Sequence, residues 1–370
     1  HLGDGGVERC FLNLARGFAE RGIGADLYLH QIAAEGLLET SPGAGIVRLQ
    51  GRSPAQRRVE LANVLPARGT GVVLTAKEED FRLISDTRRQ MINPPASVMV
   101  ASLNYTGQLL GRRAGPWRRW QRYRQVRKLF GPADRVFCVS EGVAQDIAQI
   151  LQRPLSELPV LPNPVVTPEL ERLSHAPVDH RWLQSDQPPL VLGVGRLSRI
   201  KNFPLLLRAF AKARRELAMH LMILGEGKQR PELLRLARQI GIAKDVELLG
   251  FQANPYPYMR GADLFVLSSS WEGFGNVLVE AMACGTPAAS TDCPSGPSQI
   301  LQGGRYGALV PVDNDDALAR AILTSLRHPP PAPLLAEAIH PYTLENSVSA
   351  YLLALGFPLP PNDLAVNSQL

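Results

Sequence analysis

The fold is decided by the stretch SSSWEGFGNVLVE, residues 268–280. It follows the apolar run Leu264–Leu267, which predicts a short buried strand, and it leads into Asn276–Ala283, which predicts a helix. The connecting loop carries Glu272 and two glycines, and Glu280 follows after seven intervening residues. Small glycines ahead of a helix start leave backbone N–H groups free, which favours binding of an anion there.

The two glutamates suit hydroxyl-bearing ligands, because both oxygens of a carboxylate accept hydrogen bonds. Glu280 is expected about one turn into the helix, on the side of its amino end. One carboxylate can then hold a sugar and the other the diol of a ribose. The alternative is a helix-start charge followed by a solvated glutamate.

A second stretch, GVGRLSRIKN at residues 193–202, combines a strand end with a helix start. Arg196 follows the predicted strand Leu190–Val194, and Lys201 precedes the predicted helix Asn202–Arg215. Two cations beside a helix start favour binding of a pyrophosphate. The alternative is two ordinary surface charges.

Further glycine turns follow other predicted strands. Gly225 and Gly227 come after His220–Leu224, and Gly250 with Phe251 comes after the next strand. Such turns let backbone approach a ligand closely, although each can also be a plain turn. The run Gly3-Asp4-Gly5-Gly6 precedes the first predicted helix, Val7–Arg21, and is weak evidence of the same kind.

Strands alternate with helices in both halves of the chain, which predicts parallel sheets covered on both faces. The proline-rich segment Leu158–Pro164 interrupts this alternation and predicts a domain boundary. Residues 174–189 are predicted to form a loop, and a closing helix is predicted at Thr343–Leu355, followed by a tail. The length of 370 residues fits two domains.

The E-x7-E pattern of residues 272–280, the run AMACGTP at 281–287 and the run TDCPSGP at 291–297 resemble the retaining family 4 glycosyltransferases. The last run is similar to members that use UDP-linked donors in surface-polysaccharide synthesis. The resemblance implies the GT-B fold, an α/β architecture in which two Rossmann-like doubly wound domains face each other across a cleft. It divides the chain into an acceptor-side domain at 1–163, a nucleotide-sugar domain at 164–340, and a helix with tail at 341–370 that returns to the first domain.

The resemblance also implies roles for individual residues. Arg196 and Lys201 match the residues that hold the donor diphosphate, Glu272 would orient the sugar, and Glu280 would bind the ribose. Neither a metal nor a cofactor is expected, and the departing phosphate would accept the proton of the acceptor hydroxyl without a protein nucleophile. The expected donor-binding residues are Gly195, Gly225, Gly227, Phe251, Gly273, Phe274, Gly275, Asn276, Val277 and Glu280. Gly5, Gly6 and Asn104 are expected on the acceptor side.

The sequence departs from the family pattern in three places. The glycine loop at residues 3–6 should follow a first strand, which would be central in a doubly wound sheet, so the sequence is expected to be a fragment or to have a mis-set start. Asn104 stands where many members have a histidine, which puts an acid–base role in doubt because an amide does not titrate near neutral pH. Gln299 replaces a glutamate that many relatives carry after Gly296-Pro297.

Residues 112–130 combine arginines with aromatic side chains. Eight basic residues lie between Arg112 and Lys128, and Trp117, Trp120 and Tyr123 recur at spacing three. On a helix this pattern favours an anionic membrane surface and fits a glycan or polyprenyl-linked acceptor. The alternative is an amphipathic helix packed on the sheet. Residues 1–163 carry 22 Lys and Arg against 15 Asp and Glu, so the chain's positive excess lies there.

Other features exclude some classes of protein. The four cysteines form no CxxC pair and predict buried thiols in a reducing compartment. No apolar run spans a bilayer and no signal peptide is present, so a cytoplasmic protein is expected, with peripheral contact at the inner face of the membrane as one option. No nucleic-acid motif is found, so no nucleic-acid partner is expected.

Two competing functions are considered beside the transferase. A non-catalytic nucleotide-sugar-binding subunit would fit the absent histidine and first strand, but the set of Arg196, Lys201, Glu272 and Glu280 argues against it. An NAD-dependent dehydrogenase would need a GxGxxG turn with an acidic residue about twenty positions further on, and none is found.

Overall fold

The computed structural model describes residues 5–29, 45–65, 71–111, 114–184 and 186–359. Contacts divide the chain into two compact units. Unit 1 comprises His1–Leu109, Arg113–Pro164 and Leu344–Leu370, and unit 2 comprises Leu110–Arg112 and Val165–Thr343. Gly3, Asp4, Arg112, Arg113 and the tail from residue 360 onward lie outside the described residues.

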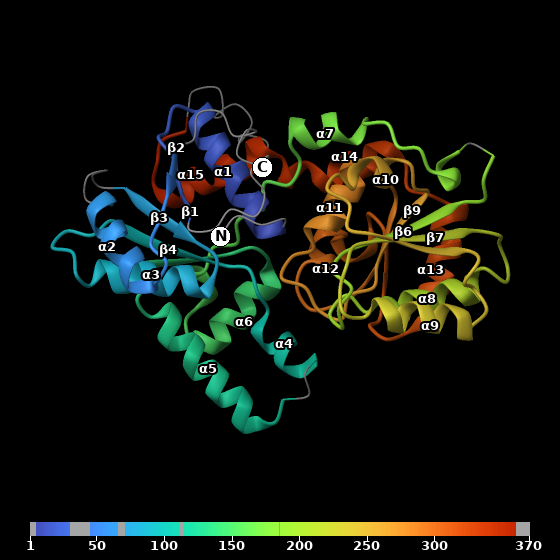
Figure 1. The fold of residues 1–370 in the computed structure, drawn as a ribbon, viewed down its shortest axis with the longest axis horizontal. Coiled ribbons are helices and arrows are strands. Elements are labelled where there is room, and N and C mark those ends of the chain that lie inside the picture. Colours follow the sequence, from blue (N-terminus) through green and yellow to red (C-terminus); the bar gives the residue numbers. More distant parts are fainter. Residues whose placement is uncertain (1–4, 30–44, 66–70, 112–113, 185, 360–370) are drawn as a thin grey trace. The chain divides into compact units, whose positions relative to one another are not determined.

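The described residues of unit 2 form one parallel sheet of six strands in the order β11-β10-β9-β6-β7-β8. Figure 1 shows β6, β7 and β9 of this sheet. The strands are β6 (Leu190–Val194), β7 (His220–Leu224), β8 (Val246–Gly250), β9 (Leu264–Leu267), β10 (Ala288–Thr291) and β11 (Ala308–Val310). The helices are α7 (Pro168–Ser174), α8 (Phe203–Ala213), α9 (Arg230–Gln239), α10 (Tyr256–Arg260), α11 (Asn276–Ala283), α12 (Pro297–Ile300), α13 (Asp315–Arg327) and α14 (Ala332–Ile339), with 3₁₀ turns η4 (Arg181–Leu183), η5 (Gln302–Gly304) and η6 (His340–Tyr342).

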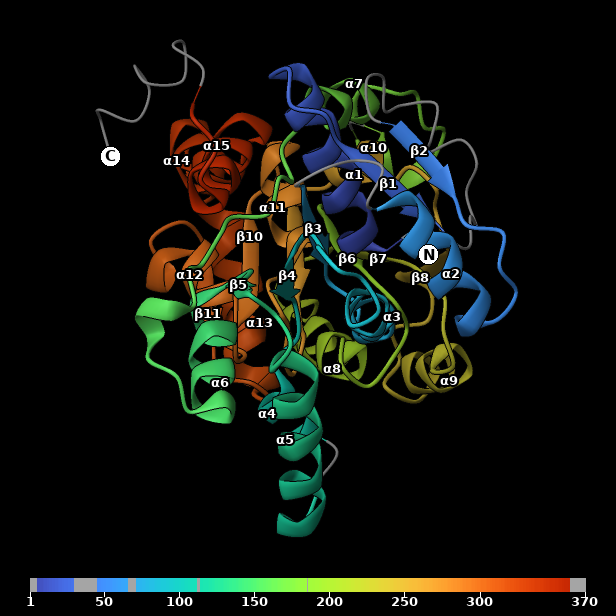
Figure 2. The same ribbon diagram turned by 90° about the vertical axis from the view of Figure 1, so that its left-hand side faces the viewer.

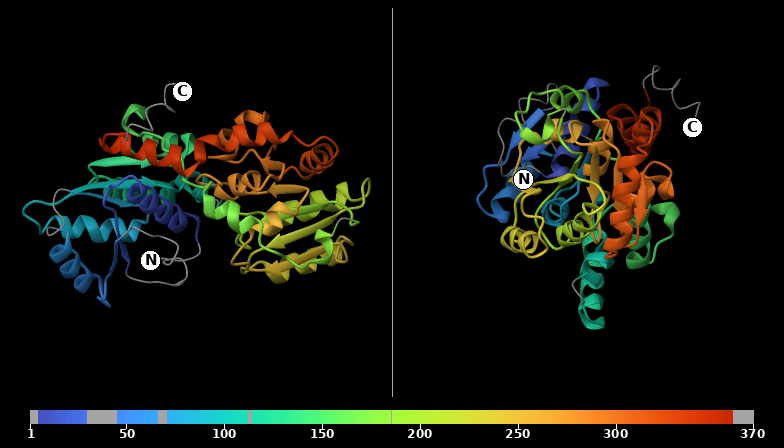
Figure 3. Two further views of the ribbon diagram at one scale, coloured as in Figure 1. Left: turned by 90° about the horizontal axis from the view of Figure 1, so that it is seen from above. Right: turned by 90° about the vertical axis from the view of Figure 1, so that its right-hand side faces the viewer.

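Both faces of this sheet are buried, as the near-continuous apolar strand sequences require. Val191 and Leu221 point to one face, where they pack in a single core with α8 and α13. The opposite face is covered by α11, which packs against α10 and α14 (Figure 3). Alternate residues of each strand therefore supply two separate apolar layers.

In the part of unit 1 that the structure describes, the strands form two separate parallel sheets, β1-β2 and β3-β4-β5. The strands are β1 (Asp26–Leu29), β2 (Gly45–Arg48), β3 (Val72–Thr75), β4 (Ala96–Ala101) and β5 (Arg135–Cys138). The helices are α1 (Gly6–Glu20), α2 (Pro54–Val64), α3 (Glu78–Arg88), α4 (Tyr105–Gly111), α5 (Pro116–Phe130), α6 (Glu141–Leu151) and α15 (Leu344–Leu355), with the 3₁₀ turn η3 (Leu155–Glu157). Within this unit, α5 extends beyond the strands, as Figure 2 shows.

The last described helix, α15, packs on the first, α1. A Cβ atom on Gly17 would lie 2.4 Å from Cγ2 of Val348, so only glycine allows this close approach of the two helices. Arg21 donates from its guanidinium to the carbonyl of Glu345 at 3.2 Å. The two ends of the described chain are thereby joined in unit 1.

One sequence-based expectation about the fold is wrong. Residues 174–189 were expected to be loop, but Arg181–Leu183 forms the turn η4 and buries Trp182. The indole stacks on the His220 ring with the centroids 4.3 Å apart. The polar, proline-bearing composition of the segment gave no local sign of this turn, because Trp182 packs on His220 of β7, which follows later in the chain.

Candidate functional site

The predicted site residues of unit 2 gather at the carboxyl edge of its sheet, meaning the edge at which the parallel strands end. The chain runs from β6 outward through β7 to β8 and then returns to β9 on the other side of β6. The order of strands therefore reverses between β6 and β9. In open α/β sheets, ligands bind outside the carboxyl ends of the strands at such a reversal.

The loop after β6 carries two of the predicted cations. Arg196 is exposed, whereas Lys201 is partly buried and its aliphatic stem lies over Gly195. Asn202 adopts a left-handed conformation, with a φ of 47°, directly ahead of α8. Its amide donates to the Asp313 carboxylate at 2.8 Å, which fixes the end of the loop.

The loop after β9 is joined to the loop after β6. The Ser270 N–H donates to the Ile200 carbonyl at 2.8 Å, and the Ser268 hydroxyl donates to the Lys201 carbonyl at 2.8 Å. These bonds bring Lys201 to Glu272, and Nζ of the lysine lies 2.6 Å from Oε1 of the glutamate. The structure therefore joins two of the predicted catalytic residues, which are 71 positions apart in the sequence.

Glu272 is held in place from three directions. The Ser269 hydroxyl donates to its Oε1 at 2.6 Å, and its own N–H donates to the Pro294 carbonyl at 3.2 Å. Its side chain lies against Gly275, which precedes α11 with a φ of 102° and supplies no side-chain cap. Glu272 therefore lies next to the first turn of α11, where the residue before the helix is a glycine and cannot cap the helix with a side chain.

The remaining residues predicted around α11 occupy its first turns. Gly273 and Asn276 are partly buried, and Val277 follows in the same turn. Phe274 is buried and packs edge-on against Tyr342, with the ring centroids 5.0 Å apart. Glu280 is the fifth residue of α11 and is buried, with 8% of its surface exposed.

The turns after β7 and β8 continue the same row. The Gly225 N–H donates to the Gly250 carbonyl at 2.7 Å, and the Leu197 N–H donates to the Glu226 carbonyl at 2.9 Å. A Cβ on Gly225 would lie 2.1 Å from the Gly195 carbonyl oxygen, and one on Gly227 would lie 2.3 Å from that of Leu197. Phe251 is 55% exposed at the end of this row. The glycines thus allow three loops to pack side by side.

Burial and nearby carboxylates shape the electrostatics of the edge. Burial and then the Glu272 carboxylate raise the pKa of Cys293 to about 12, and burial and then Glu280 raise the pKa of Cys284 to about 12. Both thiols are therefore protonated at neutral pH. Neither can serve as a thiolate nucleophile beside the two acids.

Sequence reasoning missed the residues that brace the Glu272 loop. The Thr291 hydroxyl at the end of β10 donates to the carbonyl of Ser269 at 2.6 Å. Ser269 in turn bonds to Glu272, so β10 positions the carboxylate through one intermediate residue. The sequence did contain a signal for this contact. Ser269 and Thr291 are hydroxyl residues at or just after the ends of two strands, and parallel strands end at the same edge of a sheet.

The predicted residues of unit 1 lie at two helix starts. Gly5 is the residue before α1, where a Cβ would lie 2.3 Å from Oε2 of Glu8, and Gly6 is the first residue of α1. Asn104 is buried before α4, and its Oδ1 accepts from the Gly107 N–H at 2.6 Å. Its side-chain oxygen therefore caps a helix.

A buried carboxylate lies beside Asn104 and was not among the residues predicted from the sequence. Asp146 of α6 accepts from the Tyr105 N–H at 2.6 Å and from the Thr106 N–H at 3.3 Å. Burial raises the pKa of Asp146, although its hydrogen bonds from Thr106 and Tyr105 act in the opposite direction. Asp146 therefore places a titratable carboxyl group beside Asn104, whose amide does not titrate near neutral pH.

No group of three or more His, Cys, Asp or Glu side chains among the described residues is arranged to hold a metal ion. None of the described helices has the length and apolar character needed to cross a bilayer.

The architecture is that of the GT-B glycosyltransferases. The structure of Anabaena Alr3699/HepE in complex with UDP and glucose matches it with a TM-score of 0.76 at 19% identity, covering 96% of this chain and 97% of the other. Residues 188–328 match the family model described as glycosyl transferases group 1, and residues 4–169 match the model described as glycosyltransferase family 4. The chain therefore belongs to the glycosyltransferases that these two models describe, as its sequence motifs predicted.

Two relatives of this chain carry names that state an activity or a pathway. An N-acetylgalactosamine-N,N'-diacetylbacillosaminyl-diphospho-undecaprenol 4-alpha-N-acetylgalactosaminyltransferase of Campylobacter jejuni is 34% identical over 198 residues, which are 54% of this chain and 52% of that protein. The chain thus spans about half the length of this relative. The lipopolysaccharide core biosynthesis glycosyltransferase LpsE of Rhizobium meliloti is 27% identical over 323 residues, covering 87% of this chain and 86% of that protein.

Proposed function

We propose that this protein transfers a hexose or N-acetylhexosamine from a nucleoside diphosphate, with UDP as the nucleotide, to a hydroxyl of a glycan or polyprenyl-linked acceptor. The observation that carries the proposal is the meeting of Lys201 and Glu272 at the reversal point of the unit 2 sheet. The bound UDP and glucose of the Anabaena protein and the undecaprenol-linked substrate of the Campylobacter protein support the choice of ligands.

In this proposal, Arg196 and Lys201 bind the diphosphate. Lys201 leaves Glu272 for the phosphate oxygens, and the released carboxylate accepts hydrogen bonds from the sugar hydroxyls. Exposed Arg196 approaches from the solvent side of the same loop. The ion pair at 2.6 Å would thus be the resting form of two groups that both bind donor.

The nucleoside would lie along the row of turns that ends at Phe251. Gly225 and Gly227 keep this surface free of side chains, Phe251 can stack on a base, and Glu280 would bind the ribose diol. Backbone N–H groups at the start of α11 would add their partial positive charge to that of the two cations.

Catalysis would rest on stabilising the departing phosphate. Negative charge grows on that group as the glycosidic C–O bond breaks, and two cations and a helix start oppose it. The acceptor hydroxyl attacks from the same face, and the departing phosphate oxygen accepts its proton. The anomeric configuration is then retained, and neither a metal ion nor a protein nucleophile is required.

The test is transfer or hydrolysis of a panel of UDP- and GDP-sugars, with product configuration read by NMR. The variants Arg196→Ala and Lys201→Ala are expected to lower kcat/KM by about 10²–10³. Arg199→Ala is the matched control, because Arg199 is exposed in the same loop. A chelator is expected to leave the rate unchanged. Nucleotide binding without turnover of any donor would contradict the transferase and support a binding subunit.

We also propose that α5 binds an anionic membrane surface at the cytoplasmic face, where a lipid-linked acceptor would be presented. Trp117 and Trp120 are 65% and 50% exposed and stack with centroids 5.0 Å apart. The Arg124 guanidinium lies over the Trp120 ring at 5.6 Å. Exposed tryptophans beside arginines favour the interface of anionic bilayers.

Flotation with phosphatidylglycerol vesicles tests this surface. Replacing Trp117 and Trp120 together by Ala is expected to weaken vesicle binding by about tenfold or more, since both rings are lost from the interface. Leu155→Ala, which removes another exposed apolar side chain of unit 1, is the control. Equal binding by all three proteins would contradict the proposal.

A further inference from the structure

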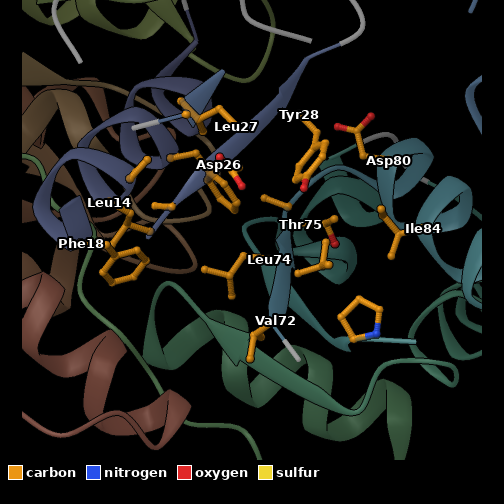
Figure 4. Close-up of a pocket in the computed structure, with 18 of the residues that line it drawn as sticks. Leu14, Phe18, Asp26, Leu27, Tyr28, Val72, Leu74, Thr75, Asp80 and Ile84 are labelled. Atoms are coloured by element: carbon orange, nitrogen blue, oxygen red, sulfur yellow. The ribbon is translucent and has the colours of Figure 1, made fainter. Parts of the chain in front are cut away.

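Choosing one sugar over another requires polar groups that are held in a fixed direction, because many sugars differ only in how a hydroxyl points. The pocket of unit 1 shown in Figure 4 offers little of this, since its walls are mostly apolar, as Leu14, Phe18 and Leu74 illustrate. The loop after β9 in unit 2 offers it. Three consecutive serines there, residues 268–270, bond to the two charged residues of the site or to the loop that carries one of them.

Two of these serines fix the loop that carries Lys201. The Ser268 hydroxyl donates to the Lys201 carbonyl at 2.8 Å, and the Ser270 N–H donates to the Ile200 carbonyl at 2.8 Å. Neither bond involves the ammonium group of the lysine. The side chain of Lys201 is therefore able to change its partner while the backbone beneath it stays in place.

The middle serine holds the carboxylate of Glu272 itself. The Ser269 hydroxyl donates to Oε1 of Glu272 at 2.6 Å, a separation typical of a hydrogen bond to a charged oxygen. Nζ of Lys201 lies 2.6 Å from the same oxygen, so both contacts fall on Oε1 and neither on Oε2. When Lys201 moves to a phosphate, as in the proposed function, Ser269 still holds Oε1.

A glutamate carboxylate needs such an anchor to have a fixed direction. Rotation about the last side-chain bond of glutamate has no narrow preferred angle, so packing of the methylene groups does not orient the two oxygens. With Oε1 bonded to Ser269, Oε2 of Glu272 is the oxygen left to accept a hydrogen bond from a ligand, and it accepts from one direction. Without the serine hydroxyl, either oxygen is free to turn toward the ligand.

Ser269 is itself held in place, and it has no surface for a ligand. It is fully buried, and its carbonyl accepts from the Thr291 hydroxyl at 2.6 Å. Thr291 is also fully buried, and the same hydroxyl lies 3.3 Å from the Leu267 carbonyl. The two residues therefore connect β9 and β10 to the carboxylate of Glu272 without reaching a ligand themselves.

We propose that Ser269 is a positioning residue that sets the sugar specificity of the donor site, and that Thr291 acts through it. Ser269 fixes Oε1 of Glu272, so that Oε2 accepts from a sugar hydroxyl of one configuration and disfavours the epimer, whose hydroxyl points elsewhere. The inference rests on the proposed function for the identity of the ligand, since it takes Glu272 to bind the sugar. It does not require that the sugar be transferred.

The test is calorimetry on the full chain with pairs of donors that differ in the configuration of a single hydroxyl. The pairs are UDP-glucose with UDP-galactose, and UDP-N-acetylglucosamine with UDP-N-acetylgalactosamine. The parent is expected to bind one member of a pair about thirtyfold or more tightly than the other, and Ser269→Ala is expected to lower this ratio to about threefold or less. Binding of UDP alone is expected to stay the same, because UDP has no sugar for Glu272 to orient.

Ser268→Ala is the matched control, because it removes a hydroxyl from the neighbouring buried serine, which bonds to a backbone carbonyl instead of the carboxylate. It is expected to change the affinity for both epimers by the same factor and to leave their ratio within about twofold of the parent. A ratio that stays the same in Ser269→Ala, or that falls equally in Ser268→Ala, would overturn the proposal. Equal affinity of the parent for both members of each pair would also overturn it.

Variants of Thr291 provide a second arm, which also decides the matter if thermal melting shows that Ser269→Ala does not fold. Thr291→Val removes the hydroxyl that holds Ser269 and nearly keeps the size of the side chain, whereas Thr291→Ser keeps the hydroxyl. The valine variant is expected to lower the epimer ratio by about threefold or more, and the serine variant to preserve it. Equal ratios in the two variants would contradict the role given to Thr291.

Transfer assays with the same donors separate this inference from the proposed function. A lowered ratio in Ser269→Ala, with no sugar transferred by the parent, would support the positioning role and contradict the transferase. Transfer by the parent, with an unchanged ratio in Ser269→Ala, would contradict the positioning role alone. A parent that binds none of these donors would contradict both.

Discussion

Single residues at the unit 2 edge owe their position to polar contacts that cross large distances in sequence. Lys201 and Glu272 have 20% and 11% of their side chains exposed, so neither charge is fully solvated. If the lysine were removed, the Glu272 carboxylate would keep the hydrogen bond from the Ser269 hydroxyl but lose its charged partner. Lys201 is therefore expected to contribute to folding as well as to donor binding.

Lys201→Ala is predicted to lower the free energy of unfolding by about 1–3 kcal/mol, since it leaves a partly buried carboxylate short of a charged partner. Lys228→Ala removes an exposed lysine of the same unit and is expected to stay within about 0.5 kcal/mol of the parent. Urea denaturation measures both. Equal stability of the two variants would show that the ion pair adds nothing to folding.

The Asp146 carboxyl gives a prediction about pH. Burial raises its pKa in the folded chain, so the folded state holds this proton more tightly than the unfolded state. The corresponding stability is fully present below the ordinary aspartate value of 3.8 and is lost as pH rises through the higher folded-state value.

Asp146→Asn removes this titration. As the pH falls from neutral toward 3.8, the parent is therefore expected to gain unfolding free energy relative to the variant. Parallel urea titrations across this range measure the difference. A difference that does not change with pH, or that grows in favour of the variant on acidification, would contradict the assigned direction.

At the scale of elements, α5 has two parts that differ in burial. Its amino-terminal half exposes Trp117 and Trp120, whereas Val126, Leu129 and Phe130 of its carboxyl-terminal half are buried. The sequence offered a membrane-facing helix and a packed helix as alternatives. The structure shows an exposed aromatic half and a packed half in one helix.

Leu129→Ala is predicted to lower the unfolding free energy by about 2–5 kcal/mol, because it removes buried methyl groups from a packed site. Trp117→Ala is expected to change it by less than about 0.5 kcal/mol, because the ring is largely exposed. Thermal and urea denaturation would test this contrast. A large loss from Trp117→Ala would mean that the exposed half also stabilises the fold.

The turn after β7 is a second element with a specific requirement. Gly225 has a φ of 132° and no room for a Cβ beside the Gly195 carbonyl, whereas Gly241 has a φ of 76° with nothing within 4 Å. Gly225→Ala is predicted to weaken UDP binding at least tenfold by displacing the turn, while Gly241→Ala costs about 1 kcal/mol of stability and leaves binding unchanged. Calorimetry with UDP measures the affinity of both variants. Unchanged binding by Gly225→Ala would remove this turn from the donor site.

At the scale of the whole chain, the described ends meet where α15 packs on α1. The contact depends on Gly17, because a Cβ there would lie 2.4 Å from Val348 and 3.2 Å from Leu344. Two segments more than three hundred residues apart therefore share one packing site in unit 1.

Gly17→Ala is predicted to destabilise the chain by about 1–3 kcal/mol through overpacking, despite the better helix propensity of alanine. Adding Val348→Ala should relieve the overlap, so the double variant loses less than the sum of the two single losses by at least about 0.5 kcal/mol. A double-mutant cycle in urea measures this coupling. Strict additivity would show that the helices do not meet at these residues.

The sequence by itself determined several elements of unit 2 and the residue types at their ends. The strands at 190–194, 220–224 and 264–267 and the helix at 276–283 were predicted with the bounds that the structure has. This was possible because continuous apolar runs and helical periodicity are local properties of the chain. The glycines and charged residues that follow these strands were predicted to lie near one another, because parallel strands end at the same edge of a sheet.

Only the tertiary structure decided which of those residues meet. Lys201 pairs with Glu272 because β6 and β9 are neighbours, Thr291 braces the same loop because β10 follows β9 in the sheet, and α15 covers α1 because Gly17 leaves room. Each of these contacts depends on strand order and on packing between distant segments, and periodicity within a segment carries no information about either.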